Sequence, residues 1–490
     1  MSGISQQFRI NPAGIFSVFA VFTLISAIMA IAENAWYLYA LPMSVIFGLF
    51  VVKYFRQTYL LLWFLIPLSI EYELSSSLAT DLPTEPFIVL LMGATILFAL
   101  ANPNTITRQL LNHPVTTILC LHVVWIGITA FFSQQLIVSG KFFVSKIWYI
   151  VVFYFLTSLL IRNEKQFKPI FWCVAIPLCF VIIQSVIRHA MLDFEFQEVN
   201  KTLTPFFRNH VNYAVMIAVV FPIAVHARTW YKSGSLERLL VHLILFVFLT
   251  GIVFAYTRAA YLSVLLIPVI YFIFAKRLTK WIAALSLFAI LLLGVFMAND
   301  NRYLSYAPDY ESTIYHEDLE DHIIATFEGK DVSSMERIYR WIAAARMCAD
   351  RPLVGFGPGN FYSYYRYYTI DNFETYVSDN IEQSGVHNYF LMTLVDQGII
   401  GLALFLAFCL SVLIAGEYLY RRSPPEQKRF VMTLLISFAI ILLNITLGDL
   451  IEVDKIGSFF FMIAALIVNF SISSKNKEAN LSLPEETNHP

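Results

Sequence analysis

The stretch VHNYFL, residues 386–391, closes the one long polar interruption of this chain and leads into an apolar segment. The interruption covers residues 299–385, and short connectors join the apolar segments on both sides of it. Apolar segments of about 20 residues are long enough to cross a lipid bilayer as helices. The order of apolar and polar stretches therefore predicts a membrane-embedded helical bundle with one large loop at one face. Arg and His side chains in such a loop, next to a returning helix, are candidates for chemistry.

The composition also indicates a polytopic membrane protein. Of the 490 residues, 58% are hydrophobic and only 14% are charged, whereas soluble domains carry about 25% charged residues. The formal net charge of −1 gives no reason to expect a nucleic-acid partner. Only Cys348 of the five cysteines lies in the loop, so no disulfide framework is expected. The polar N-terminus leads directly into a full-length apolar segment, and we expect no cleavable signal peptide.

Fourteen segments are candidate transmembrane helices, and the short third and fourth form an alternative re-entrant pair that lowers the count to twelve. They cover residues 13–32, 35–52, 57–70, 86–101, 115–133, 140–161, 169–188, 210–227, 238–256, 259–275, 280–298, 398–416, 429–447 and 455–471. Helices are expected because the bilayer core satisfies no backbone hydrogen bonds. The sequence therefore predicts an all-α bundle of about 12–14 transmembrane helices.

The placement of Lys and Arg predicts the orientation of the bundle. Alternate connectors, beginning with residues 53–56, carry the basic residues, and the connectors between them are acidic or nearly uncharged. Because basic connectors stay in the cytoplasm, we expect cytoplasmic termini and an outer large loop. The chain then divides into N-terminal transmembrane helices (1–298), the loop with amphipathic helices (299–397), C-terminal transmembrane helices (398–471) and a disordered cytoplasmic tail (472–490).

Arg258 is the first candidate for a functional role. It stands in AYTRAAY, residues 255–261, between two apolar segments with almost no loop. A cation at this depth needs a partner or an aqueous cavity, and the alternative is a side chain that snorkels to the outer headgroups. The position runs against the charge bias of the outer connectors, which favours function.

Residues 335–350 predict an amphipathic helix on the outer surface. Apolar residues alternate there with three arginines at helical spacing. The apolar residues are Trp341, Ala344 and Ala345, and the arginines are Arg337, Arg340 and Arg346. Contact with lipid headgroups is the alternative to a catalytic role for each arginine.

The next segment, RPLVGFGPGNF at residues 351–361, has three glycines at alternate positions. This spacing resembles a phosphate-binding loop, but no strand precedes it and no Walker-type Lys follows. A tight backbone path after the helix explains the glycines better.

His387 is the candidate general base because an unperturbed histidine titrates near neutral pH. A structural hydrogen bond is the alternative role for this side chain. Arg208 and Lys141 are further outer-face cations that suit either anion binding or interfacial anchoring, and Asn388 adjoins His387. The Cys and His spacing supports no zinc site, and we expect neither a metal nor another cofactor.

Taken in order, these segments resemble the shared core of the O-antigen ligase and O-antigen polymerase superfamily. The matching motifs are Thr257-Arg258-Ala259-Ala260, Arg337-x-x-x-Trp341, Pro352-x-x-Gly355-x-Gly357-x-Gly359-x-Phe361, His387-Asn388-x-x-Leu391 and Gly398-x-x-Gly401. They cover residues 258–401. Thr257 and Ala259 replace the Ser and Gly that are usual in the family, while the Arg between them is retained.

The resemblance implies a metal-independent, inverting glycosyltransferase of GT-C-like helical fold in the bacterial inner membrane. Its donor would be a glycan on undecaprenyl diphosphate at the periplasmic face, and its acceptor a lipid or glycan hydroxyl among the membrane lipids. By position, Arg258 and Arg337 would bind the diphosphate and His387 would be the catalytic histidine. Arg208, Arg340, Lys141 and Asn388 are further candidates for binding diphosphate or glycan.

Three activities within the superfamily remain open, and the late position of the loop favours the first. A ligase transfers the finished glycan to lipid A-core, a polymerase extends it on its carrier, and protein O-oligosaccharyltransferases use Ser or Thr acceptors. A lipid-glycan flippase or transporter is the alternative from another class. It would need charges inside the bundle, whereas the charged residues here gather at the ends of the segments and in the loop.

Overall fold

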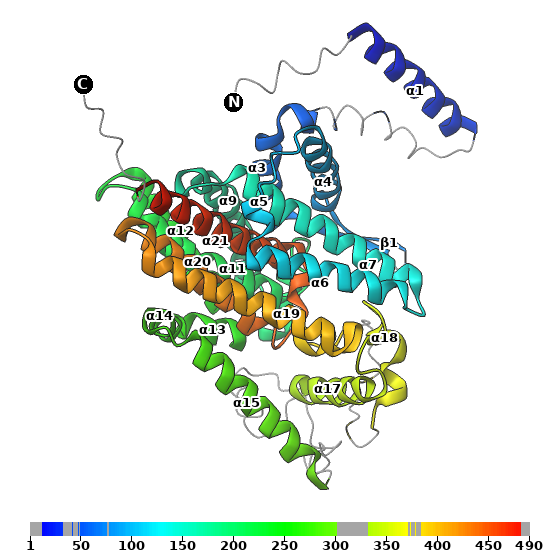
Figure 1. Ribbon diagram of the computed structural model, residues 1–490, viewed down its shortest axis with the longest axis vertical. Helices are drawn as coiled ribbons and strands as arrows, with labels where there is room; N and C mark the ends of the chain where they lie inside the picture. Colours follow the sequence, from blue (N-terminus) through cyan, green and yellow to red (C-terminus); the bar gives the residue numbers. More distant parts are fainter. Residues whose placement is uncertain are drawn as a thin grey trace.

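The computed structural model describes residues 12–32, 42, 48, 50–75, 78–300, 332–370, 373, 378 and 384–481. Within these ranges the chain is almost entirely helical, and long helices run side by side (Figure 1). The expected all-α polytopic architecture is confirmed.

Nine helical stretches among the described residues are long and apolar enough to cross a membrane, or ten if the bent pair α13–α14 counts as one. They are α4 (Thr84–Ala101), α6 (Pro114–Phe131), α7–η3–α8 (Leu136–Tyr149, Ile150–Leu156, Thr157–Leu160), α9 (Glu164–Ala190), α11–η5 (His210–Ala227, Arg228–Trp230), α12 (Leu236–Val253), α15 (Thr279–Ala298), α19 (Tyr389–Arg422) and α21 (Asp454–Leu481). The bent pair is α13 (Arg258–Leu265) and α14 (Ile267–Lys276).

Four further segments that were expected to cross the membrane are not among these helical stretches. Residues 13–32 form α1 (Pro12–Ala32), and residues 429–447 fall largely in α20 (Pro425–Asn444). The segment at 57–70 gives only the short α3 (Phe55–Leu65) and the turn η2 (Ile66–Leu68). Most of the segment at 35–52 lies outside the described residues.

A β-hairpin occupies part of the connector that the sequence marked only as acidic. Strands β1 (Ile70–Ser75) and β2 (Leu78–Leu82) pair antiparallel, with Ile70 opposite Leu82. The expected re-entrant pair is therefore a short helix, a hairpin and the full-length α4.

The core of the bundle lies around α11 and α21, most of whose residues are buried, whereas the apolar side chains of α15 are exposed along its length. A helix that is apolar all round and uncovered by protein needs lipid around it. This pattern supports the membrane assignment independently of the hydropathy of the sequence.

Two boundaries drawn from sequence differ in the structure, and one expected element agrees with it. Helix α19 begins at Tyr389 and is broken at Gly398, so the C-terminal helical part starts earlier than residue 398. Helix α21 continues to Leu481, which makes residues 472–481 helical instead of a disordered tail. Helix α17 (Val332–Asp350) covers the amphipathic helix expected at 335–350.

Short elements complete the described structure. They are α5 (Arg108–Leu111), η4 (Phe196–Glu198), α10 (Val199–Leu203), α18 (Phe361–Tyr364), η7 (Tyr365–Tyr368) and η9 (Leu450–Glu452). Helix α17 packs against α19 and η7, and α18 lies at the same end of the bundle (Figure 1). The motifs within the large loop therefore meet at the start of α19.

Candidate functional site

Helix α17 has a buried apolar face that agrees in part with the expected one, because Ala344 is buried and Trp341 is partly buried against the same hydrophobic cluster. Met335, Tyr339, Ala343 and Met347 are the buried residues at helical spacing, while Ala345 is exposed. Most of this face packs in a hydrophobic cluster that includes Phe356, Phe361, Tyr365, Val386 and Val395. The helix is thus held by the protein itself, which fixes the positions of its arginines.

Those arginines differ in burial and in partners. Arg340 is 5% exposed, Arg337 is half-buried, and Arg346 is exposed. The Nη2 of Arg340 lies 3.4 Å from Glu336 Oε2, and its Nη1 donates to the carbonyl of Gly385 at 3.5 Å. Arg346 donates instead to the carbonyls of residues 368 and 369, which makes it a structural link within the loop.

His387 lies beside Arg337 and Arg340. Burial and, after it, the positive charges of Arg340 and Arg337 together lower the pKa of His387 to about 3. The imidazole is therefore neutral at physiological pH. The ordinary pKa of about 6.5 applies only to a solvated ring away from other cations, and His387 is neither.

The backbone of His387 is held by Asp449, a residue that the sequence analysis used only as part of an acidic connector. His387 has φ of 56°, in the left-handed region, and its N–H donates to Asp449 Oδ2 at 3.3 Å. The N–H of Asn388 also donates to this carboxylate. Two positions before His387, a Cβ on Gly385 would lie within 3.0 Å of Asp449 Oδ2. A carboxyl at the end of an apolar segment was the signal that could have identified it.

Asp449 is a second titratable group of the site. Burial and the negative charge of Glu452 outweigh the hydrogen bond from His387 and the charge of Arg340, and the pKa of Asp449 is raised to about 7 as the net result. Its Oδ1 is buried and has no hydrogen-bond partner among the described residues. The structure thus places a neutral histidine beside the charges of Arg337 and Arg340, and a carboxyl of raised pKa beside that of Arg340.

The glycine motif serves the packing of the loop, as expected. Gly355, Gly357 and Gly359 have φ values of 68°, 93° and 77°. The N–H of Phe356 donates to the carbonyl of Val395, and that of Gly357 to the carbonyl of Asp396, both at 2.9 Å.

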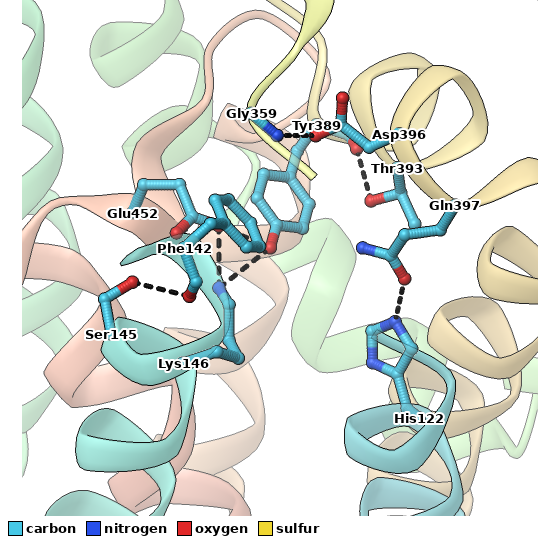
Figure 2. A network of polar contacts seen from close by, with 10 residues as sticks. All are labelled: His122, Phe142, Ser145, Lys146, Gly359, Tyr389, Thr393, Asp396, Gln397 and Glu452. Carbon is cyan, nitrogen blue, oxygen red and sulfur yellow. Dashed lines mark hydrogen bonds and ion pairs between the residues drawn. The ribbon is translucent and has the colours of Figure 1, made fainter. Parts of the chain in front are cut away.

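The partner of the glycine segment is the break in α19. Gly398 has φ of 68°, and beyond it Ile399 N–H donates to the carbonyl of Pro352 at 2.8 Å. The Asp396 carboxylate accepts from Gly359 N–H at 2.9 Å (Figure 2). The two glycine motifs are separate in sequence, but their backbones pack together and are joined by hydrogen bonds. This joint fixes the position of α17 relative to α19.

Arg258 is half-buried and is the first residue of α13. Further along α13, Ser263 Oγ accepts a hydrogen bond from Asn444 Nδ2 at 2.7 Å. Ile445, which follows Asn444, accepts through its carbonyl from the N–H of Tyr389 at 2.9 Å. The end of α20 thus links α13 to the start of α19, next to His387.

The remaining candidates lie in other settings. Arg208 is exposed and its Nη1 lies 3.6 Å from Glu71 Oε1 of the hairpin. Lys141 is exposed on α7. The side chain of Asn388 caps α19 by accepting from Leu391 N–H at 3.0 Å, a structural role that accounts for its place after His387.

The fold and the site describe a multi-pass helical membrane protein whose large loop packs arginines against a histidine. The family model of O-antigen ligase matches residues 243–406 of this chain. This range contains Arg258, α17, the glycine motif and His387, and the match confirms the resemblance to the O-antigen ligase and polymerase superfamily, whose members are glycosyltransferase-like enzymes. No curated protein matches the chain.

Proposed function

We propose that this protein transfers a glycan from undecaprenyl diphosphate to an acceptor hydroxyl at the periplasmic face of the inner membrane, as an O-antigen ligase does. The observation that carries the proposal is the grouping of Arg337 and Arg340 with His387, inside the range that the O-antigen ligase family model matches. Two guanidinium groups beside a neutral imidazole suit a reaction that expels a diphosphate and removes a proton from a hydroxyl.

The reaction is a single displacement at the anomeric carbon of the donor sugar. The acceptor oxygen forms the new bond, the bond to the phosphate oxygen breaks, and the lipid diphosphate leaves with the electron pair. Attack opposite the leaving group inverts the anomeric configuration. Arg337 and Arg258 offset the charge that develops on the diphosphate, because a guanidinium binds two phosphate oxygens at once. This role makes a metal unnecessary.

The acceptor proton goes to His387. The low pKa of His387 is caused by burial and by the two arginines, so a bound diphosphate that neutralises the arginines raises it again. The imidazole is then a better base in the complex than in the empty site. Asp449 holds the His387 backbone and is the second candidate to take up the proton.

The orientation of the protein is part of the proposal. The basic connectors alternate with acidic ones along the sequence, and this pattern favours cytoplasmic termini with α17 and His387 outside. A glycan donor that has already crossed the membrane on its lipid carrier would then reach the site from the periplasmic side.

Polymerase and protein O-oligosaccharyltransferase activities use the same donor, and the family match is compatible with both. The transporter alternative gains one observation from the structure, because charged residues such as Lys146 are buried in the bundle. The arrangement of arginines and histidine in the matched range still favours transfer chemistry.

Analysis of the surface glycans of a deletion strain tests the proposal. Loss of long chains from lipid A-core, with lipid-linked polymer accumulating, is the result expected for a ligase. Lipid A-core that carries single repeat units identifies a polymerase, and unchanged lipopolysaccharide with unglycosylated proteins identifies a protein glycosyltransferase.

A further inference from the structure

Next to the start of α19 the protein contains a buried ion pair that the transfer chemistry does not use. Lys146 Nζ lies 2.6 Å from Glu452 Oε1, and the lysine side chain is 4% exposed. Tyr389 joins the pair: its hydroxyl donates to the same carboxylate oxygen at 2.7 Å and accepts from Lys146 at 3.1 Å (Figure 2). Lys146, Glu452 and Tyr389 form the Lys146 triad.

The surroundings of the triad make a charged lysine costly there. Lys146 belongs to a candidate membrane span, Leu136–Leu160, and three aromatic rings lie around its ammonium group. The distances from Nζ to the ring centroids are 5.1, 5.7 and 6.0 Å for Phe142, Tyr389 and Phe461. Ionisable residues inside membrane spans are expensive and commonly functional, and cation–π contacts offset part of the cost.

The helix that carries Lys146 is also irregular directly after it. Helix α7 passes into the π-helical segment η3, Ile150–Leu156. Such wide turns occur often at functional sites, where they redirect side chains. A small cavity adjoins this point, and its lining includes Lys146, Tyr389 and His122.

Both partners of Lys146 belong to segments that carry site residues. Tyr389 is the first residue of α19 and follows His387 by two positions. Glu452 lies in η9, three positions after Asp449, whose carboxylate accepts from the His387 N–H. The Lys146 triad therefore fastens the two segments of the site to a third helix.

We propose that Lys146 is a positioning residue for the transfer reaction: through Tyr389 and Glu452 it sets the height and orientation of His387 and Asp449 over the acceptor. The inference rests on the proposed transfer at His387. Buried ion pairs contribute little net stability in general and are better explained where they specify a geometry. Here the geometry is that of the segments on both sides of the site.

The main test uses a neutral replacement of the pair. The double variant Lys146→Met/Glu452→Gln leaves no unpaired buried charge, so it should fold, but it loses the two contacts of Lys146 that hold Tyr389 and residue 452. We expect kcat to fall about 10- to 100-fold, the range for a catalytic group displaced by about 1 Å. The KM for the lipid diphosphate donor should stay unchanged because the arginines are intact.

A pair of the same burial elsewhere in the bundle gives a matched control. His226 and Glu164 lie 2.8 Å apart with side chains 4% and 26% exposed, against 4% and 24% for Lys146 and Glu452. They join the end of α11 to the start of α9, away from α19. The double variant His226→Leu/Glu164→Gln should keep its kcat, whatever happens to its thermal stability.

The variant Tyr389→Phe keeps the ion pair and removes only the hydroxyl, so folding is not at risk. It should lower kcat several-fold with an unchanged KM. Wild-type kcat in both Tyr389→Phe and the double variant would show that the triad is only a structural ion pair and would overturn the proposal.

Hydrogen exchange separates this inference from the proposed function. In the Lys146→Met/Glu452→Gln variant, the amides of residues 387–389 should exchange faster than in the wild type and in the His226→Leu/Glu164→Gln control. Absence of glycan transfer by the wild-type protein would refute the proposed function alone. Unchanged exchange at residues 387–389 would refute the positioning role alone.

Discussion

The guanidinium groups of the site can bind a diphosphate in a way that an ammonium group cannot. Arg337 is half-buried on α17, a helix held by its own hydrophobic cluster. A planar group that is fixed in this way can bind two oxygens of a diphosphate together, whereas Lys offers a point charge. Charge alone therefore does not explain the choice of residue.

Replacement of Arg258 or Arg337 by Lys should lower glycan transfer strongly although the charge is kept. A hydrogen bond to a charged group contributes about 1.5–3 kcal/mol, so the loss of one corresponds to about 10- to 100-fold in kcat/KM. Arg346→Lys is the control on the same helix, because Arg346 donates hydrogen bonds to carbonyl groups of the loop and not to the diphosphate. Near-wild-type transfer by both Arg258→Lys and Arg337→Lys would reduce these residues to membrane anchors.

The pH profile distinguishes His387 from Asp449. The pKa of His387 is lowered to about 3 and that of Asp449 is raised to about 7. Above pH 7 the Asp449 carboxylate is charged and accepts from the His387 N–H, and below pH 7 it is protonated and holds the loop less firmly. The kcat/KM of the free enzyme should therefore rise with pH through about 7, and Asp449→Asn should abolish this dependence. If the kcat/KM of Asp449→Asn still changed with pH near 6.5, the titration would belong to His387. That result would contradict the low pKa of His387.

At the scale of elements, the joint between the glycine loop and the break in α19 positions the site. The backbones of the two segments exchange hydrogen bonds directly, at Phe356 with Val395 and at Ile399 with Pro352. Such an approach leaves no room for side chains, and a Cβ on Gly355 would lie within 3.0 Å of the Val395 carbonyl. The glycines are therefore required by packing and not by phosphate binding.

Gly355→Ala should lower the thermal stability of the detergent-solubilised protein and its transfer rate together. The left-handed conformation alone costs a non-glycine residue about 1–2 kcal/mol, and the clash adds to it. Gly140→Ala on α7 is the matched control, since no atom lies within 4 Å of its added Cβ. That variant should be neutral or slightly more stable, by about 0.5–1 kcal/mol. Equal stability of Gly355→Ala and the wild type would mean that the glycine loop and the break in α19 do not pack as closely as described.

The sequence predicted the elements of the site better than their contacts. The periodicity of residues 335–350 gave a helix, and the structure has α17 there, because local spacing determines helix formation. It gave the buried face only in part, since Ala344 is buried as expected, whereas Ala345 is exposed and Met335 is buried. The loop packs on its own cluster and not only on lipid, and that packing depends on residues far apart in sequence.

The same limit explains why Asp449 and Lys146 were missed. Asp449 follows His387 by 62 positions, and Lys146 lies 306 positions before Glu452. No local pattern connects residues at such separations. Burial also changes the properties of the site residues, as the low pKa of His387 shows, and burial is decided by the fold.

At the scale of the whole molecule, apolar composition predicted the membrane bundle, and the uncovered α15 agrees with it. The hairpin at Ile70–Leu82 was not expected, because short strands in a connector carry little hydrophobic signal. The orientation across the membrane follows only from the alternation of basic connectors, and it needs its own experiment.

Cysteine labelling with an impermeant reagent tests this orientation. In a background without Cys348, Arg366→Cys at the exposed η7 should react from outside in intact cells. Arg162→Cys, exposed in a connector expected to be cytoplasmic, should react only after the membrane is disrupted. The reverse pattern would place His387 in the cytoplasm and exclude the proposed donor face.

The most direct test of the central claim is a transfer assay with purified protein in liposomes. The assay supplies a glycan on undecaprenyl diphosphate together with lipid A-core, and it measures the glycosylated acceptor with and without a chelator. We expect transfer by the wild type that the chelator does not affect. His387→Ala should lower it by about 10²–10⁴-fold, the usual contribution of a positioned acid-base group, while the donor still binds. Strict dependence on a divalent metal, or substantial transfer by His387→Ala, would contradict the account.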